Sequence, residues 1–212
     1  MHTLNGAQII IRQLEHLGVD TIAGIPGGAN LPLYEALAAS ATIRHVLARH
    51  EQGAGFIAQG IARTTGKPAV CFATSGPGAT NLVTGLATAY MDSIPVVAIT
   101  GNVPVDLLGR DSFQEVDIMG VTMPITKHNY QIKDVTRISD IVREAFAFAK
   151  SGRPGPVLID IPSDLFNQTC EYTPPEGKLC MSCRLTDIPI DKIKVMIGEA
   201  QRPAILAGGG VV

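Results

Sequence analysis

The chain is organised around the stretch Arg49-His50-Glu51-Gln52-Gly53-Ala54-Gly55 and its companion Thr74-Ser75-Gly76-Pro77-Gly78-Ala79-Thr80-Asn81. Each stretch follows a short apolar run, at residues 43–48 and 69–73, and each opens a segment of helical character. Short apolar strands between helices are typical of a parallel sheet that is covered on both faces. Loops that leave such strands at their carboxyl ends gather at one edge of the sheet. We therefore interpret the two stretches as half of a cofactor site.

The same alternation extends toward both ends of the chain. Apolar residues at helical spacing predict a first helix at residues 7–17, which Gly18 can end in a left-handed conformation. We expect six strands, at residues 19–25, 43–48, 69–73, 96–100, 128–132 and 156–162, and further helices at 31–37, 50–65, 78–91 and 141–149. The predicted fold class is α/β, with a parallel sheet of about six strands and helices on both faces.

The regular pattern stops near Ser163. Residues 166–189 contain two prolines and a glycine close together and lack strong periodicity, which is typical of a linker between domains. After the linker we expect a helix from Ile190 and a strand from Arg202 that ends in a glycine turn. The predicted organisation is a first domain at residues 1–165, a linker at 166–189, and the start of a second, truncated α/β domain at 190–212.

The composition excludes several classes of protein. Of the 212 residues, 46% are hydrophobic and 17% are charged, and the net charge of -2 offers no basic surplus for nucleic acid. The N-terminus lacks the pattern of a signal peptide, and no run reaches the roughly 18 apolar residues of a membrane span. We expect a soluble, cytoplasmic protein that binds neither nucleic acid nor a membrane.

The four cysteines do not form a disulfide pattern, and a reducing compartment is the simpler expectation. Cys180-Met181-Ser182-Cys183 has the spacing of half a zinc site, but only Cys170 lies near it in the sequence. Because a structural zinc site requires four ligands, we predict no metal site in this chain.

Glu51 has two interpretations. It is the only carboxylate in the three loops that follow the first three predicted strands, and its glycine and alanine neighbours would leave it poorly solvated. Poor solvation favours the protonated carboxyl group, which can pass a proton to a ring nitrogen. Alternatively, Glu51 is an ordinary acidic residue in the first turn of a helix, where the helix dipole favours negative charge.

Other motifs also allow more than one interpretation. Residues 75–81 follow a strand and open a helix, as in a dinucleotide fingerprint, but Asn81 stands where the third glycine belongs, and a tight glycine turn fits better. Residues 113–117 can be a simple helix start. Arg153 can cap the preceding helix, because cations favour that end. None of these residues alone decides the function.

Taken together, six motifs resemble the acetolactate synthase large catalytic subunit, a family of thiamine-diphosphate enzymes also called acetohydroxyacid synthase. The resemblance covers nearly all of residues 4–165 and favours the proton-transfer interpretation of Glu51. The motifs are Gly24-Ile25-Pro26-Gly27-Gly28, Arg49-His50-Glu51-Gln52-Gly53-Ala54, Ser75-Gly76-Pro77-Gly78-Ala79-Thr80-Asn81-Leu82, Asp92-Ser93-Ile94-Pro95-Val96, Phe113-Gln114-Glu115-Val116-Asp117 and Ser151-Gly152-Arg153-Pro154-Gly155-Pro156-Val157.

The resemblance implies a reaction. Residues 1–165 would be the domain that binds the pyrimidine ring of thiamine diphosphate, and Glu51 would hydrogen-bond N1′ of that ring and so promote loss of the thiazolium C2 proton. Pyruvate would lose carbon dioxide and the remaining two carbons would add to a second 2-oxo acid, pyruvate or 2-oxobutanoate, in branched-chain amino-acid biosynthesis. The cofactor would supply the electron sink, and the protein proton control and orientation.

The resemblance also implies roles for other residues. Glu51 and Gln114 would be catalytic, Phe113 would line the substrate channel, and Gly27 and Gly28 would form a loop near the reacting carbon. The residues implied to bind cofactor are Pro26, Gly27, Gly28, Glu51, Thr74, Pro77, Asn81 and Gln114 for thiamine diphosphate, and Arg153 for FAD.

The sequence departs from the family in two places. Ser163 stands where the family commonly has a lysine, which puts that channel cation in doubt. The family's Gly-Asp-Gly and Asn-Asn site for the diphosphate and Mg²⁺ is absent, so we expect those ligands in a missing C-terminal domain and an inactive fragment. Because the family builds each site between two subunits, a homodimer or higher homo-oligomer is implied, with a regulatory small subunit as a further implied partner.

Two alternatives stay open. The chain can belong to another thiamine-diphosphate enzyme, such as a 2-oxo acid or oxalyl-CoA decarboxylase, although residues 113–117 favour acetolactate synthase. Glyoxylate carboligase is similar over much of this region but is expected to lack the glutamate, so Glu51 argues against it. The chain can also be a non-catalytic pyrimidine-type domain that serves in binding or assembly.

Overall fold

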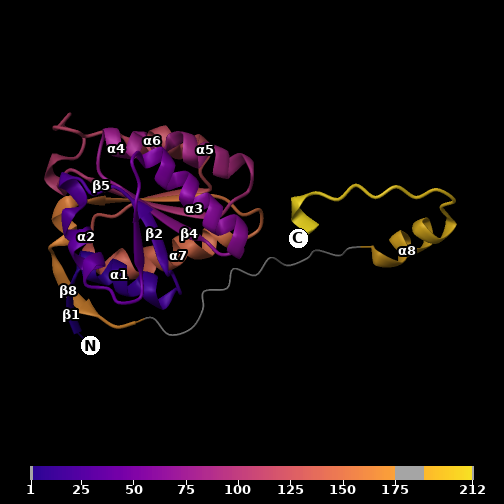
Figure 1. Ribbon diagram of the computed structural model, residues 1–212, viewed down its shortest axis with the longest axis horizontal. Helices are drawn as coiled ribbons and strands as arrows, with labels where there is room; N and C mark the ends of the chain where they lie inside the picture. The colour runs from indigo at the N-terminus through magenta and orange to yellow at the C-terminus, as the bar shows by residue number, and fades with distance from the viewer. Residues whose placement is uncertain (1, 175–188, 212) are drawn as a thin grey trace. The chain divides into compact units, whose positions relative to one another are not determined.

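The computed structural model describes residues 2–174 and 189–211. The chain forms two units, residues 1–181 and 182–212. The first unit is built on a six-stranded parallel sheet (Figure 1). Its strands, in the spatial order β3-β2-β4-β5-β7-β6, are β3 (Arg44–Leu47), β2 (Thr21–Gly24), β4 (Ala69–Ala73), β5 (Val96–Asn102), β7 (Val157–Pro162) and β6 (His128–Gln131). The predicted fold class and all six predicted strands are confirmed.

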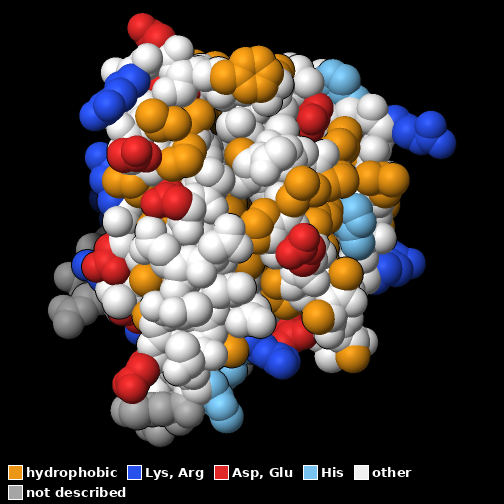
Figure 2. Space-filling model, turned by 90° about the vertical axis from the view of Figure 1, so that its left-hand side faces the viewer, with side chains coloured by type: hydrophobic (Ala, Val, Ile, Leu, Met, Phe, Trp, Pro, Cys, Tyr) orange, Lys and Arg blue, Asp and Glu red, His pale blue; other side chains and the backbone are white. Residues whose placement is uncertain are grey.

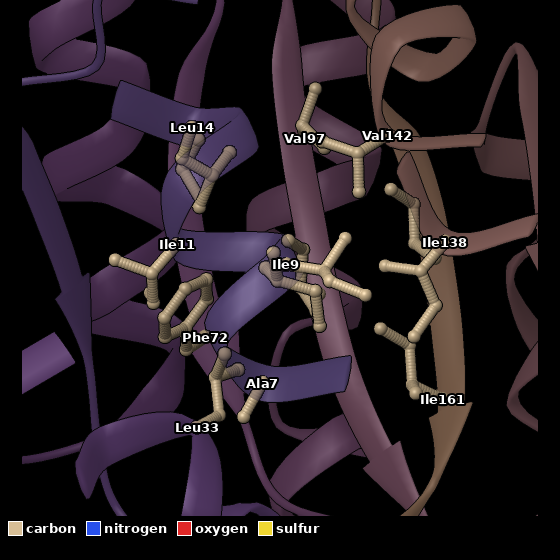
Figure 3. Close-up of a cluster of buried hydrophobic side chains, with 14 of the residues drawn as sticks. Ala7, Ile9, Ile11, Leu14, Leu33, Phe72, Val97, Ile138, Val142 and Ile161 are labelled. Atoms are coloured by element: carbon tan, nitrogen blue, oxygen red, sulfur yellow. The ribbon is translucent and has the colours of Figure 1, made fainter. Parts of the chain in front are cut away.

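Helices cover both faces of this sheet, as expected. On one face, α1 (Gly6–His16), α2 (Leu31–Ala38) and α7 (Ile138–Lys150) enclose a core that includes Ile9, Phe72 and Val142 (Figure 3). On the other face, α3 (Glu51–Thr65), α5 (Val83–Met91) and α6 (Ile118–Thr122) pack over a core made largely of alanine. Each large side chain that is fully buried contributes roughly 1.5–3 kcal/mol. The two faces together hold the strand ends in fixed positions.

Local signals in the sequence account for several helix ends. Asn5 caps α1, because its Oδ1 accepts from the Gln8 backbone N–H at 2.8 Å while the Gln8 side chain accepts from the Asn5 N–H at 3.0 Å. Gly18 has a φ of 77°, the left-handed conformation expected after this helix. The single helix expected at residues 78–91 is instead two, α4 (Pro77–Thr80) and α5, because the Leu82 N–H bonds back only three residues, to Ala79.

The start predicted for the linker, at residue 166, is too early in the chain. Residues 169–172 form β8 (Thr169–Tyr172), which pairs antiparallel with β1 (His2–Asn5) in a two-stranded sheet that sequence analysis missed. Phe166 is fully buried in the core of the first unit, and Tyr172 is 6% exposed. The first unit therefore extends past residue 165. The two strands are short and partly polar, and each needs a partner from the other end of the unit, so neither has a recognisable pattern alone.

In the second unit, α8 (Ile190–Glu199) forms as predicted. The predicted strand from Arg202 is wrong, because residues 203–207 have no regular structure and only a short 3₁₀ turn, Gly209–Val211, follows. A strand requires a hydrogen-bonded neighbour, and none lies within residues 189–211. Cys180 and Cys183, whose spacing is that of half a zinc site, lie outside the described residues. No helix in the described parts of the chain has the length and hydropathy needed to cross a membrane.

Candidate functional site

The carboxyl ends of the parallel strands form one edge of the first unit. Helices α2 and α4 follow the ends of β2 and β4, and both lie toward the left of Figure 1. Figure 2 views this side: hydrophobic side chains gather over part of it, single acidic side chains interrupt them, and lysine and arginine lie mostly at the margins. This is the edge at which sequence analysis placed the two organising stretches.

Glu51 and Asn81 join the two stretches at this edge. The Asn81 Nδ2 donates a hydrogen bond to Glu51 Oε2 at 2.9 Å. A Cβ at Gly78 would lie 3.3 Å from Glu51 Oε1, so the absence of a side chain there leaves room beside that oxygen. Among the hydrogen bonds of the described residues, none reaches Oε1. The carboxyl group thus has one engaged oxygen and one that is available to a ligand.

The start of α3 places Glu51 at this position. The Nδ1 of His50 accepts from the Gln52 N–H at 3.1 Å and caps the helix, so that Glu51 is its first residue. A carboxylate is favoured there by the helix dipole. Both interpretations of Glu51 are therefore compatible with the structure, and the contact with Asn81 is the additional feature that a simple helix start does not require.

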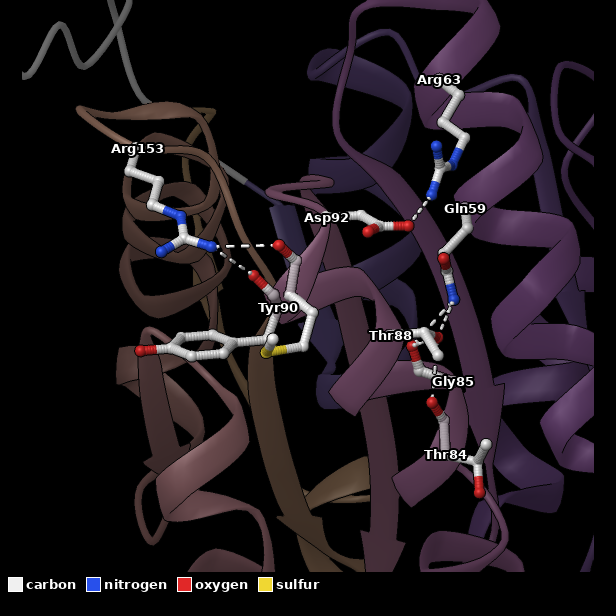
Figure 4. Close-up of polar contacts among 9 residues, drawn as sticks. Gln59, Arg63, Thr84, Gly85, Thr88, Tyr90, Asp92 and Arg153 are labelled. Atoms are coloured by element: carbon white, nitrogen blue, oxygen red, sulfur yellow. Dashed lines mark hydrogen bonds and ion pairs between the residues drawn. The ribbon is translucent and has the colours of Figure 1, made fainter. Parts of the chain in front are cut away.

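Helix α3 is in turn held by close packing against α5. A Cβ at Gly85 would lie 3.3 Å from the Cα of Gly55, so the two helix backbones approach directly. The buried Gln59 donates from Nε2 to the Gly85 carbonyl at 2.8 Å and to Thr88 Oγ1 at 2.9 Å (Figure 4). These contacts fix the position of the helix that carries Glu51.

The loop after β2 packs onto the second stretch. A Cβ at Gly27 would lie 2.6 Å from Cβ and Cγ2 of Thr74, so only glycine fits at residue 27. The Thr74 Oγ1 accepts from the Ala29 N–H at 3.3 Å, and Asn30 Oδ1 accepts from the Gly27 N–H at 2.8 Å. Gly28 and Pro26 lie in the same loop and are exposed. The structure thus brings the Gly27 loop beside Thr74, and the cofactor-binding roles of these residues stay predictions.

The loop at residues 103–117 also reaches the second stretch. A Cβ at Gly76 would overlap the carbonyl of Gln114, and both residues are left-handed, with φ of 54° and 57°. Such a conformation costs a non-glycine residue roughly 1–2 kcal/mol and needs support from its surroundings. The Gln114 side chain is exposed, and Phe113 is 88% exposed. The structure therefore places Gln114 at the site through its backbone but shows no contact of Phe113 with the other predicted residues.

Glu115 supports this loop. Its carboxylate accepts backbone hydrogen bonds from Gly109 and from Ser112, the latter at 2.9 Å. These bonds, with that of Ser112 the strongest, hold the pKa of Glu115 below its usual range. Asp117 then caps α6 through the Gly120 N–H at 2.9 Å. The helix thus begins directly after residues 113–117, with Asp117 as its cap.

Pro77 and Ser163 also lie at this edge of the sheet. Pro77 is the first residue of α4, where the N–H that proline lacks would have no partner in the helix. Ser163, which stands in place of the family's lysine, directly follows β7 at the same edge and is half-buried. Among the described residues, no hydrogen bond joins Ser163 to the Glu51 carboxylate.

Arg153 lies apart from this group. Its Nε donates to Ser93 Oγ at 2.8 Å, and its Nη2 donates to the carbonyls of Tyr90 and Met91 at 3.2 and 3.1 Å (Figure 4). It therefore caps the end of α5, whereas sequence analysis considered the helix that precedes Arg153 itself. Arg153 and Ser93 come just before β7 and β5, so they lie at the opposite edge of the sheet from Glu51. A role in FAD binding stays a prediction.

The group around Glu51 fits an aminopyrimidine ring. The free Oε1 can share a proton with a ring nitrogen, and the glycines at residues 27, 76 and 78 keep the surrounding loops close without filling the space with side chains. Within the described ranges, no cluster of three or more His, Cys, Asp or Glu side chains is placed to hold a metal ion.

Comparison with known families agrees with this geometry. Residues 4–121, more than half of the chain, match the model for the thiamine pyrophosphate enzyme, N-terminal TPP binding domain. The chain belongs to the thiamine pyrophosphate enzyme family. The matched segment contains Glu51, Thr74, Asn81 and Gln114, and it ends before Arg153.

Several curated relatives in the thiamine pyrophosphate enzyme family are acetolactate synthases. The chain is 51% identical to the acetolactate synthase isozyme 1 large subunit of Escherichia coli over 98% of its own length and 37% of the relative's. It is 52% identical to an acetolactate synthase of Mycobacterium bovis, over 100% and 35%, and 50% identical to the large subunit of Corynebacterium glutamicum, over 99% and 34%. The chain thus spans about a third of the length of these relatives.

Proposed function

We propose that the chain is the pyrimidine-binding part of an acetolactate synthase large subunit, which joins pyruvate to a second 2-oxo acid with loss of carbon dioxide. The observation that carries this proposal is the hydrogen bond of 2.9 Å from Asn81 to Glu51, which leaves one carboxyl oxygen free at the strand edge. The identity of about half of all residues to three acetolactate synthases supports the choice of reaction within the family.

The residues of this chain have separate tasks in the proposed reaction. Asn81 engages Oε2 of Glu51, so that a proton on the carboxyl group resides on Oε1, beside Gly78. From there Glu51 can hold or release the proton toward N1′ of the pyrimidine ring, as general acid–base catalysis requires. Thr74, with the Gly27 loop packed on it, forms the adjoining wall.

When bound, thiamine diphosphate supplies the electron sink for the loss of carbon dioxide from a 2-oxo acid. We propose that its diphosphate and Mg²⁺ are held by a part of the enzyme beyond this chain, on the strength of the family resemblance. An FAD contact by Arg153 is proposed on the same ground; its Nε and Nη2 already have partners within the chain, so the contact would fall to Nη1.

The proposed partners follow from the same resemblance. A homodimer or higher homo-oligomer would complete each site from two chains, and a regulatory small subunit would be a further partner. We propose that the fragment alone is inactive, that the complete protein works in the cytoplasm in branched-chain amino-acid biosynthesis, and that residues 190–212 begin its central domain.

The test uses the complete enzyme with thiamine diphosphate and Mg²⁺. Glu51→Gln should lower acetolactate formation from pyruvate, and exchange of the cofactor's C2 proton, by roughly 10²–10⁴-fold, because it removes the general acid–base group. Glu35→Gln, the same change at an exposed position on α2, is the matched control and should leave both rates unchanged. Equal rates in the Glu51→Gln and wild-type enzymes would remove Glu51 from the mechanism.

The same assays separate the alternative functions. Release of an aldehyde from a 2-oxo acid, without acetolactate, would identify a decarboxylase. A complete protein that binds no thiamine diphosphate would instead be a non-catalytic pyrimidine-type module.

A further inference from the structure

A buried polar cluster lies at the carboxyl ends of β5 and β7. Asp160 is fully buried, and its Oδ1 accepts from Thr100 Oγ1 at 2.7 Å. Its Oδ2 accepts from Asn102 Nδ2 at 2.6 Å and more weakly from Gln131 Nε2 at 3.4 Å. Thr100 is fully buried and Asn102 is 3% exposed. The carboxylate therefore ties three neighbouring strands together where they end.

Asn102 passes this contact on to the following loop. While its Nδ2 donates to Asp160, its Oδ1 accepts from the Val103 backbone N–H at 2.8 Å. An amide side chain has one donor end and one acceptor end, so the acceptor at Asp160 determines which end faces Val103. A second carboxylate on the same side, Asp164, accepts from the Val105 N–H at 3.1 Å. The first residues of the loop are thus held by Asp160 of β7, through Asn102, and by Asp164 of the 3₁₀ turn that follows β7.

The other end of this loop forms part of the site described above. The Gln114 backbone rests on Gly76 in a left-handed conformation, and the hydrogen bonds to Glu115 brace the chain between residues 109 and 115. The loop is anchored at Val103 and held again near Gln114. We expect a displacement at Val103 to move the residues near Gln114 as well. The loop thus connects the Asn102 amide to the Gln114 backbone that rests on Gly76.

We infer that Asp160 is a positioning residue, which holds the loop of Val103 to Gln114 against the Glu51 site through the side chain of Asn102. Its consequence for catalysis rests on the proposed function, whereas its consequence for the loop does not. Asp160 itself contacts none of the predicted site residues.

The chemistry of the cluster supports a role beyond joining strands. Two strands can be joined by apolar side chains at lower cost, because burying a carboxylate carries a desolvation penalty. Burial, with a smaller contribution from the nearby charge of Asp117, raises the pKa of Asp160 to about 6, although the bonds from Asn102, Thr100 and Gln131 oppose this shift. A carboxylate is the group that can accept from all of these donors at once.

The test measures hydrogen–deuterium exchange of the loop amides in the 212-residue chain. Asp160→Leu removes both acceptor oxygens, so the Asn102 amide loses the partner that fixes its orientation, and the Val103–Gln114 amides should exchange at least tenfold faster. In the double variant Asn102→Asp/Asp160→Asn, the two side chains are swapped. The new amide at residue 160 can donate to the new carboxylate at residue 102, and that carboxylate still offers an acceptor to the Val103 N–H. This double variant should return the loop to wild-type exchange.

Thr100→Val is the matched control, because it removes a bond of similar length from the same carboxylate without touching Asn102. Its loop should exchange as in the wild type. Unchanged loop exchange in Asp160→Leu would overturn the inference, as would a folded double variant with a fast loop. If Asp160→Leu does not fold, the double variant decides: wild-type loop exchange supports the inference, and an unfolded chain or a fast loop overturns it.

The catalytic consequence is measured in the complete enzyme. Asp160→Leu should lower kcat roughly ten- to hundredfold, as expected when a catalytic group is misplaced, and the double variant should recover most of it. A normal kcat in Asp160→Leu would overturn the positioning role in catalysis. The two claims can fail separately. If the wild-type enzyme forms no acetolactate but the loop amides exchange as predicted, the proposed function is wrong and the inference about Asp160 and the loop is supported.

Discussion

Glu51 works as part of a pair. The family resemblance assigns Asn81 to the cofactor pocket, but its side-chain nitrogen is 2.9 Å from Glu51 Oε2, which gives it a more specific task. A donor at one oxygen orients the carboxyl group and leaves the other oxygen free for the proton transfer that we propose. Asn81 is thus better described as a positioning residue for Glu51 than as a residue that only lines the pocket.

Asp160 gives a prediction about pH and stability. Its pKa is raised from 3.8 to about 6 in the folded chain, so the folded state binds this proton more tightly than the unfolded state. Its contribution to the free energy of unfolding should therefore fall as pH rises from about 4 to 6 and stay constant above that, a total of roughly 3 kcal/mol. Urea unfolding of the wild type and Asp160→Asn, at pH 4.5 and pH 7, measures this contribution.

The comparison between the two proteins isolates the single carboxyl group. Wild-type stability relative to Asp160→Asn should be greater at pH 4.5 than at pH 7, because only the wild type loses this contribution. Parallel stability profiles over that range would contradict the raised pKa.

The helices around the site approach their neighbours most closely at glycine residues. Gly55 and Gly85 bring α3 and α5 into backbone contact, and Gly78 lets α4 approach both Thr74 and Glu51. In each case a Cβ would meet backbone or a short side chain, which cannot move far. Glycine at these contacts sets the distance between elements, and through it the position of the Glu51 carboxyl group.

Gly78→Ala tests this contact directly. The added Cβ would lie 2.7 Å from Thr74 Cγ2 and 3.3 Å from Glu51 Oε1, so α4 must shift. We expect a loss of about 1–3 kcal/mol in the free energy of unfolding, as for other overpacked sites, and weaker thiamine diphosphate binding by the complete enzyme. Thermal unfolding and a cofactor titration measure the two effects.

Gly60→Ala is the control for this substitution. Gly60 lies within α3 and has no neighbour within 4 Å of an added Cβ, so alanine should stabilise the helix by up to about 1 kcal/mol. Similar effects of the two substitutions would mean that the close approach at Gly78 has no energetic consequence.

The first unit as a whole is closed by its two ends. Strand β1 begins it and β8 ends it, and they pair from His2 with Tyr172 to Asn5 with Thr169. Phe166 and Tyr172 add their rings to the core formed by α1 and α7. The segment after residue 165 is therefore part of the unit that carries the site.

Truncation tests this boundary. A chain of residues 1–174 should unfold in urea at the same midpoint as the first unit within the 212-residue chain. A chain of residues 1–165 should be less stable by roughly 3–5 kcal/mol or fail to fold, because it loses the buried Phe166 and the partner of β1. Equal stability of the two truncated chains would show that β8 contributes nothing to the unit.

Much of this arrangement could be read from local patterns. The apolar runs predict the six strands and the fold class, and the loops after β2, β3 and β4 meet as expected because all parallel strands end at one edge. For the same reason, Glu51 and residues 74–81 were correctly placed together. Gly18 was likewise recognisable, since the end of a helix depends on neighbouring residues.

Other features depended on the folded chain, because their partners are distant in the sequence. Asn81 and Glu51 are 30 residues apart, Asn102 and Asp160 are 58 apart, and β8 pairs with a strand at the opposite end of the unit. No periodicity specifies which side chains meet across such distances; packing of the helices and the register of the strands determine it. The sequence alone therefore indicated where the site lies, and the folded structure showed which residues hold it in place.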